Sequence, residues 1–338
     1  MERIITENKD NKAKLWEPQD ESAKPDANPE VRTEPKTEPK AEPRTEPKTE
    51  PKQETKAEIT INATVISHKG CVRENNEDNF FFDGDLMRDE TVNEGAVISA
   101  KITKEFHLLA ICDGMGGLQG GERASSIGVH ALDLLNMYMP ANTVNRAIDV
   151  LAETACKKVY EDSIEIGEAG REGTTMALLY MADGRAHVGN VGDSRVYVLR
   201  NGKLYQLSTD HSPVYREMLA GKLTREQMRK HPNANVIGAY IGMSDEKKPK
   251  NYGSYFMTGL CAGDRFLLCS DGLSDLLSHE EITKWLMESQ DPKLAASRLM
   301  WRALEMGGKD NTTVIVCDVS APGLPAPTQA STVRLQQR

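Results

Sequence analysis

The sequence lacks paired cysteines, and this absence narrows the class of protein. Its six cysteines form no Cys-x-x-Cys pair, and no His or Cys cluster has the spacing of a zinc site. Several cysteines lie in apolar runs, where a reduced thiol behaves as a small hydrophobic side chain. We therefore expect a reducing compartment without structural disulfides, and a cytoplasmic protein.

Signals for export or membrane insertion are also missing. The first residues, MERIIT, lack the apolar core of a signal peptide. No stretch approaches the roughly 20 apolar residues that a membrane span needs. The net charge of −9 argues against a nucleic-acid binder that neutralises phosphates, and it suits a site that collects cations. We expect a soluble monomer with no nucleic-acid partner and no membrane span.

Residues 1–58 have the composition of a disordered arm. Thr-Glu-Pro-Lys recurs with small variations between residues 33 and 52. Proline at every fourth position forbids a regular helix, and almost nothing apolar is present to offset the entropy cost of ordering. We interpret the arm as a solvated tether, with a docking arm or a row of phosphorylatable threonines as the alternative. Residues 321–338 hold three early prolines and are predicted to be a disordered tail.

The periodicity of residues 59–320 predicts one layered α/β domain. Apolar spacing of three and four predicts four amphipathic helices, at residues 124–139, 143–166, 278–289 and 292–306, and an irregular one at 213–230. Strand patterns cover residues 63–67, 80–82, 108–113, 174–180, 186–190, 194–200, 204–207, 266–269 and 312–319, and residues 83–94 read as a surface loop. Asp-Gly and Asn-Gly at 183–184 and 201–202 predict hairpins, and so a mainly antiparallel meander. Two packed sheets with a helix pair outside each satisfy this pattern.

Carboxylates stand at the ends of three apolar strands. Asp113 and Asp271 each follow such a strand, and Asp310 precedes another. Carboxylates brought together repel one another unless a cation lies between them. An all-oxygen ligand set suits Mg²⁺ or Mn²⁺, and we expect a pair of such ions that act on phosphate.

Further polar residues extend this candidate site. Glu77, Asp78 and Asp193 are additional ligand candidates, and Arg73 carries a fork of donors that matches two phosphate oxygens. Each residue taken alone has a purely structural explanation, since Asp-Gly is usually a turn and an arginine near acids is usually a surface ion pair. Only the combination supports a site.

Seven short motifs occur together in one order. They are RENNED (73–78), DGMGG (113–117), GTT (173–175), GNVGDSR (189–195), DHS (210–212), SDG (270–272) and DNT (310–312). With these motifs the chain resembles the metal-dependent serine/threonine protein phosphatases of type 2C, in their bacterial form. The resemblance covers roughly residues 60–320 and does not extend to the arm or the tail.

The resemblance implies an α-β-β-α sandwich with a two-metal centre that hydrolyses phosphoserine and phosphothreonine on proteins. It implies in-line attack by a metal-bridging water or hydroxide and a serine/threonine kinase as the functional opponent. The implied ligands are Asp113 bridging both ions, Asp271 and Asp310 on one ion, Glu77 and the Gly114 carbonyl on the other, Asp78 behind them, and Asp193 with Asp271 on a weaker third ion. Arg73 would bind the substrate phosphate, and residues 213–259 would form a mobile flap.

One position departs from the pattern of many family members. Those members, chiefly eukaryotic, carry a histidine after Asp-Gly that is proposed to protonate the leaving group, and this chain has Met115. Methionine cannot donate a proton, so the general acid stays open among a metal-bound water, His68, His211 and other groups.

Two alternatives to an active phosphatase remain. A pseudophosphatase would bind phosphoproteins without turnover, but such scaffolds usually lose a ligand, and here none is missing. A regulator of an anti-sigma-factor system usually carries extra domains, for which this chain has no room.

Overall fold

The computed structural model describes residues 58–86, 95–116, 120–167, 170–249 and 252–336. Residues 1–57 of the predicted arm lie outside this range, so the prediction of a disordered arm is not tested. All described residues belong to the unit Glu54–Arg338.

One sheet brings the chain ends of the domain together. Its strand order is β10-β9-β12-β13-β1-β4, and every pairing is antiparallel. The strands are β1 (Ile59–His68), β4 (Ala96–Lys104), β9 (Arg195–Arg200), β10 (Lys203–Gln206), β12 (Arg265–Cys269) and β13 (Thr312–Ser320). The last strand thus lies beside the first, which closes residues 59–320 into one folded body.

The second sheet carries the strand that ends near Asp113. Its order is β11-β8-β7-β5-β2-β3, again antiparallel, and β6 pairs with β5 at one end. The strands are β2 (Asp78–Phe82), β3 (Asp85–Leu86), β5 (Phe106–Met115), β6 (Gly173–Thr174), β7 (Met176–Ala182), β8 (Arg185–Val191) and β11 (Ser254–Gly259). The two predicted hairpin turns are present, since Asp183 and Asn201 each adopt the left-handed conformation before a glycine.

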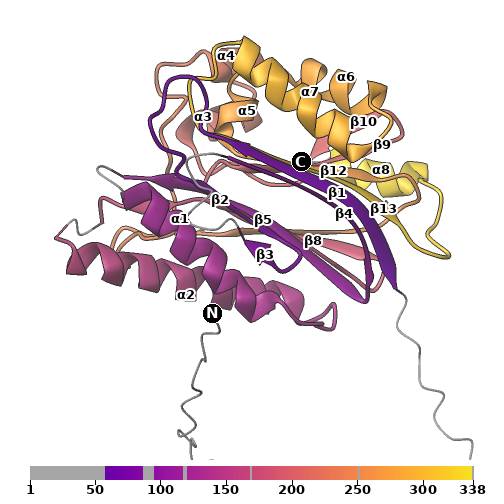
Figure 1. The fold of residues 1–338 in the computed structure, drawn as a ribbon, viewed down its shortest axis with the longest axis horizontal. Helices are drawn as coiled ribbons and strands as arrows, with labels where there is room; N and C mark the ends of the chain where they lie inside the picture. The colour runs from indigo at the N-terminus through magenta and orange to yellow at the C-terminus, as the bar shows by residue number, and fades with distance from the viewer. Residues whose placement is uncertain (1–57, 87–94, 117–119, 168–169, 250–251, 337–338) are drawn as a thin grey trace, which may run out of the picture. The chain divides into compact units, whose positions relative to one another are not determined.

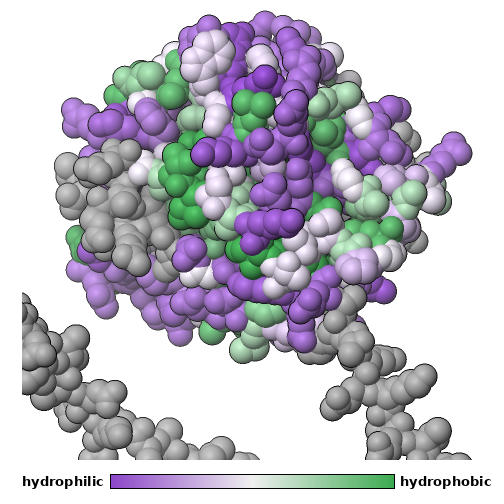
Figure 2. Space-filling view, turned by 45° about the vertical axis from the view of Figure 1, so that its right-hand side comes forward, coloured by the Kyte–Doolittle hydropathy of each residue, from purple (hydrophilic) through white to green (hydrophobic). Residues whose placement is uncertain are grey.

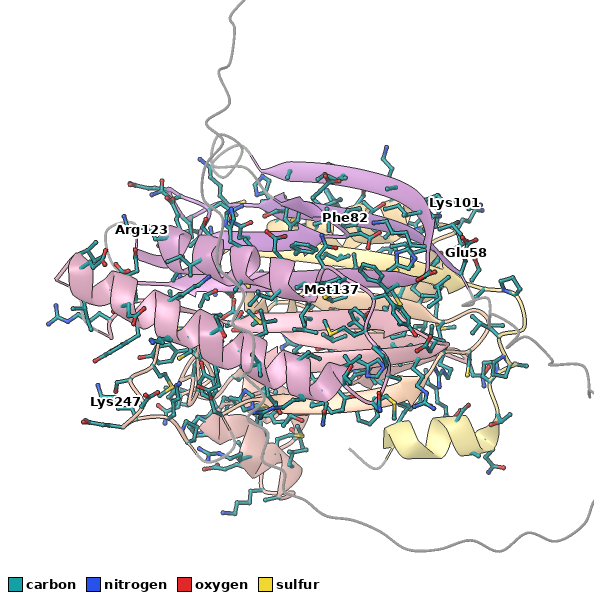
Figure 3. The ribbon with its side chains drawn as sticks, turned by 90° about the horizontal axis from the view of Figure 1, so that it is seen from below. Glu58, Phe82, Lys101, Arg123, Met137 and Lys247 are labelled. Carbon is teal, nitrogen blue, oxygen red and sulfur yellow. The ribbon has the colours of Figure 1, made fainter. Side chains whose placement is uncertain are left out.

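Helices cover the outer face of each sheet, as Figure 1 shows. On one side lie α1 (Gly120–Ala131), the short 3₁₀ helix η2 (Leu132–Leu135) and α2 (Val144–Glu165); on the other lie α5 (Asp271–Ser274), α6 (His279–Glu288) and α7 (Pro292–Glu305). Arg123, labelled in Figure 3, joins α1 to α2 through two hydrogen bonds to Asp162. The predicted α-β-β-α sandwich is therefore confirmed.

Three apolar clusters hold the layers together. The central one fills the space between the two sheets, and includes Val65, Phe80 and Ile315. The second lies under α1 and α2, and the third lies under α6 and α7. The space between the sheets is mostly apolar, and the predicted ligands lie at or just beyond the strand ends.

Several elements differ from the sequence prediction. Strand β4 was missed, although its residues alternate between exposed and half-buried as an edge strand should. The predicted helix at 213–230 is two helices, α3 (Pro213–Leu219) and α4 (Arg225–Arg229), because Gly221 between them has a φ of 73°. Strand β11 lies in the region predicted as flap.

The segment after residue 320 also differs from the predicted disordered tail. It contains α8 (Gln329–Gln336), and Leu335 is buried in the central cluster between the sheets. The Pro325 carbonyl accepts a hydrogen bond from the Ala262 amide at 2.9 Å. Burial of Leu335 stabilises an ordered C-terminal segment, although the prolines in this segment had predicted disorder.

The described surface offers no membrane-spanning element. None of the helices in the described ranges is both long and apolar enough to cross a bilayer. On the face drawn in Figure 2, hydrophilic side chains separate the apolar residues into small patches.

Candidate active site

Asp113 lies near the end of β5 and is fixed by its backbone. Its amide donates to the Thr175 hydroxyl at 3.0 Å, and its carbonyl accepts from the Thr174 hydroxyl at 2.9 Å and the Thr175 amide at 2.8 Å. A Cβ on the next residue, Gly114, would lie 2.1 Å from the Gly121 carbonyl oxygen. The glycine is therefore required for the start of α1 to approach the end of β5.

Glu77 and Asp78 reach the same place from β2. The antiparallel register puts Asp78 opposite Asp113, and the Gly114 amide donates to the Glu77 carbonyl at 3.2 Å. A Cβ on Gly121 would lie 2.6 Å from the Glu77 carboxyl carbon, so this carboxyl group lies against the first turn of α1. The positive end of a helix dipole favours a carboxylate there.

Asp271 and Asp310 come from the other sheet. Asp271 opens α5 directly after β12, and Asp310 lies two residues before β13, the strand that pairs with β12. Ser270 links the two sheets, because its hydroxyl donates to the Asp78 carboxylate at 2.7 Å and accepts from the Thr313 amide at 2.9 Å. The strand ends that carry the predicted ligands therefore meet.

Arg73 lies at the exposed rim of this group. One of its terminal nitrogens donates to Asp310 Oδ2 at 2.8 Å, and the Arg73 side chain keeps half of its surface exposed. Its loop is held by Asn311, whose side-chain amide donates to the carbonyls of Lys69 and Asn75 and accepts from the Glu77 amide. These hydrogen bonds hold the loop that carries both Arg73 and Glu77.

The carboxylates repel one another strongly. Burial, followed by the neighbouring Asp78 and Asp271, raises the pKa of Asp113 well above its ordinary value. Burial, with Asp193 as the largest charge contribution, does the same to the pKa of Asp271, and burial raises the pKa of Asp78 to about 6. Such a cluster is stable near neutral pH only with bound protons or with a cation.

Asp193 adds a further buried carboxylate beside Asp271. It follows Gly192 in the turn between β8 and β9, and it lines a small buried pocket with Asp271 and Asp275. Burial, with Asp210 next, raises the pKa of Asp193 to about 7, and its Oδ1 has no hydrogen-bond partner.

A metal ion is the group that these residues fit best. Asp78 Oδ1 is, like Asp193 Oδ1, a buried acceptor without a partner, and every candidate donor is an oxygen, as Mg²⁺ and Mn²⁺ prefer. Among the described residues, no three His, Cys, Asp or Glu side chains already stand in a metal-holding arrangement. The side chains would therefore have to turn toward an ion as it binds.

The structure also adds residues that sequence reasoning missed. Asp275 lines the same pocket as Asp193 and Asp210. Burial is the largest cause that raises the pKa of Asp275, and the negative charges of Asp210 and Asp310 add to it. The spacing of four between Asp271 and Asp275 was the available signal, since such residues share one side of a helical turn. His68 and His211 each accept a backbone hydrogen bond, from Gly70 and Gly192 respectively, so both ring nitrogens Nδ1 are engaged in holding loops.

Comparison with known proteins places this architecture among characterised relatives. A family model described as protein phosphatase 2C matches residues 87–305. The serine/threonine protein phosphatase PstP of Mycobacterium tuberculosis is 34% identical over 255 residues, which are 75% of this chain and 44% of that protein. The chain therefore spans less than half the length of this relative. Protein phosphatase PhpP of Streptococcus pneumoniae is 32% identical over 217 residues, which are 63% of this chain and 86% of PhpP.

A solved structure resembles the chain over the same region. The catalytic domain of PstP in complex with two manganese ions superimposes with a TM-score of 0.62 and 31% identity. The match covers 77% of this chain and 99% of that one.

Proposed function

Because this chain belongs to the protein phosphatase 2C family, we propose that it hydrolyses phosphoserine and phosphothreonine on proteins with the help of divalent metal ions. The observation that carries the proposal is the meeting of Asp78, Asp113 and Asp271 at one edge of two sheets, where burial and mutual repulsion raise their pKa values. A structural role alone would not require three buried carboxylates to share one place.

The residues would divide the work of metal binding. Asp113 would bridge two ions, as the resemblance implies, with Asp271 and Asp310 on one ion and Glu77 and the Gly114 carbonyl on the other. The PstP catalytic domain, solved in complex with two manganese ions, supports a centre with two ions. When bound, such a pair of Mn²⁺ or Mg²⁺ ions supplies an activated water for in-line attack on phosphorus.

The remaining residues hold the ligands and the substrate. Ser270 donates to one Asp78 oxygen, and Asp78 would support the centre from behind, as the resemblance implies. Asp193 and Asp271 share the pocket in which a weaker third ion would bind. Arg73 has further donors beside the one it gives Asp310, and its exposed fork can hold two phosphate oxygens.

We propose phosphorylated proteins as partners, a serine/threonine kinase as the functional opponent, and a monomer in the cytoplasm. Unpaired thiols at all six cysteines support a reducing compartment. The general acid stays open, because Met115 cannot donate a proton and His68 and His211 use one ring nitrogen each as an acceptor.

Hydrolysis of a phosphothreonine peptide by the full chain, with and without Mn²⁺, tests the proposed function. We expect turnover that needs Mn²⁺ and that Asp113→Asn and Asp271→Asn abolish without unfolding the chain. Asp245→Asn is the matched control, since the Asp245 side chain is 94% exposed. A folded wild-type chain that is inert with Mn²⁺ would support the scaffold alternative and refute the phosphatase.

A further inference from the structure

Helix α4 lies in the segment expected to form the flap, and it has little apolar attachment to the domain. It packs with α3 in a small cluster of its own, formed by Val214, Tyr215 and Met228. This cluster is separate from the three that build the sandwich. The position of α4 on the domain must therefore depend largely on polar contacts.

Arg229, the last residue of α4, makes the most direct of these contacts. Its Nη2 donates to the Leu276 carbonyl at 2.9 Å, and its Nε donates to the Asp275 carbonyl at 3.3 Å. These two carbonyls follow α5, the single helical turn that begins with Asp271. A cation at the negative end of a helix stabilises that turn.

Arg225 lies four residues earlier and reaches the domain at a second place. Its guanidinium donates to Gln206 Oε1 at 3.2 Å, and the Gln206 amide donates to Asp210 at 2.7 Å. Asp210 forms a buried ion pair with Arg195 at 2.6 Å, and Arg195 lies two residues after Asp193 in the sequence. Arg229 therefore contacts the turn that carries Asp271, and Arg225 contacts the hydrogen-bonded residues next to Asp193. Asp271 and Asp193 line one pocket.

We propose that Arg229 is a positioning residue that fastens the flap to the α5 turn and so holds Asp271 in place for the third ion. This inference rests on the proposed function, because it assigns a role within the same metal site. Arg229 itself lines the pocket with Asp193, Asp271 and Asp275, and its charge partly offsets that of Asp275. Without it, the α5 turn would lose its cap and α4 would lose its hydrogen bonds to that turn.

Hydrogen exchange of the full chain tests this proposal without requiring activity. The Asp275 and Leu277 amides are hydrogen-bonded within the α5 turn, at 2.8 and 2.9 Å. Arg229→Met keeps the aliphatic stem and removes the charge. We expect exchange of these amides and of residues 213–235 to rise about tenfold or more. Lys230→Met is the matched control, because Lys230 is an exposed neighbour whose only described ion pair is with Glu226 on the same helix.

Calorimetric titration with Mn²⁺ adds a reading that a purely structural role would not change. Arg229→Met should weaken the weakest binding step about tenfold and leave the tighter steps unchanged, and Arg229→Lys should recover part of the loss. Exchange at Asp275 and Leu277 within twofold of the wild type would overturn the proposal. If the wild type bound no Mn²⁺ and hydrolysed nothing, the proposed function would fail, while the exchange result would still decide the role of Arg229. Should Arg229→Met not fold, the milder Arg229→Lys gives the same comparison.

Discussion

Replacing Asp193 by asparagine should change how the stability of the metal-free protein depends on pH. Asp193 is buried, and burial with the nearby Asp210 raises its pKa from 3.8 to about 7. The folded chain therefore keeps this proton up to about pH 7, whereas the unfolded chain releases it near pH 4. Between these values the folded state binds more protons, so stability falls as the pH rises.

The size of the effect follows from the distance between the two pKa values. One pH unit within this window is worth about 1.4 kcal/mol, so the wild type should lose about 3 kcal/mol between pH 5 and the folded pKa of about 7. Asparagine cannot ionise and lacks this loss. The difference in free energy of unfolding, Asp193→Asn minus wild type, should therefore grow by about 3 kcal/mol between pH 5 and pH 8. This growth corresponds to roughly 6 °C in melting temperature.

Urea unfolding in a chelator at pH 5 and pH 8 measures this difference. Titrating groups far from Asp193 contribute equally to both proteins, so their contributions cancel when the variant is subtracted from the wild type. Asp271 does not cancel, because Asp193 raises its pKa, and its change adds to the measured difference. Saturating Mn²⁺ at pH 8 should reverse the order, since only the wild type offers the carboxylate to an ion. A gap that stays constant or narrows with pH would refute the assignment of Asp193 to a strained acidic cluster.

Three further substitutions test the structure. Leu335→Ala should lower the free energy of unfolding by about 2–3 kcal/mol in urea, with Leu219→Ala at a half-exposed position as a near-neutral control, and equal losses would argue against a docked C-terminal helix. Gly114→Ala should abolish Mn²⁺ binding in calorimetry, because its Cβ would collide with backbone, whereas Gly259→Ala has no atom within 4 Å and should bind normally. Arg200 forms a fully buried ion pair with Asp264 at 2.6 Å. Arg200→Met leaves the Asp264 carboxylate buried without this partner and should lower the free energy of unfolding by about 3–5 kcal/mol. An unchanged urea midpoint would contradict the pairing.

Local patterns were sufficient to predict most of the fold. Helices α2, α6 and α7 and the hairpin turns at Asp183 and Asn201 follow from spacing and from residues that tolerate the left-handed conformation. The single helix predicted at 124–139 was wrong in its bounds, because α1 ends at Ala131 and the 3₁₀ helix η2 follows it. Strand β4 was missed because its residues pair with residues of β1 that lie 29 to 45 positions earlier, and a short alternating run resembles a loop without that partner. The docking of Leu335 depends equally on distant residues, so no local signal could reveal it.

The candidate site shows the same division between local and long-range information. Asp113, Asp271 and Asp310 were found because each lies at the end of an apolar strand or just before one. Nothing in the sequence shows that Ser270 joins the two sheets or that Arg229 caps the turn of Asp271, because both contacts depend on where distant segments meet. The pKa values could not be predicted either, since burial is their largest cause.

Anomalous scattering from a crystal of the full chain grown with Mn²⁺ would measure the central feature directly, the convergence of these carboxylates on shared cations. We expect two manganese peaks about 3.5–4 Å apart, with the Asp113 carboxylate between them and Asp271 bound to one of the pair. Fully occupied manganese bound elsewhere, with Asp113 and Asp271 making no contact to it, would contradict a metal centre at this edge of the sandwich.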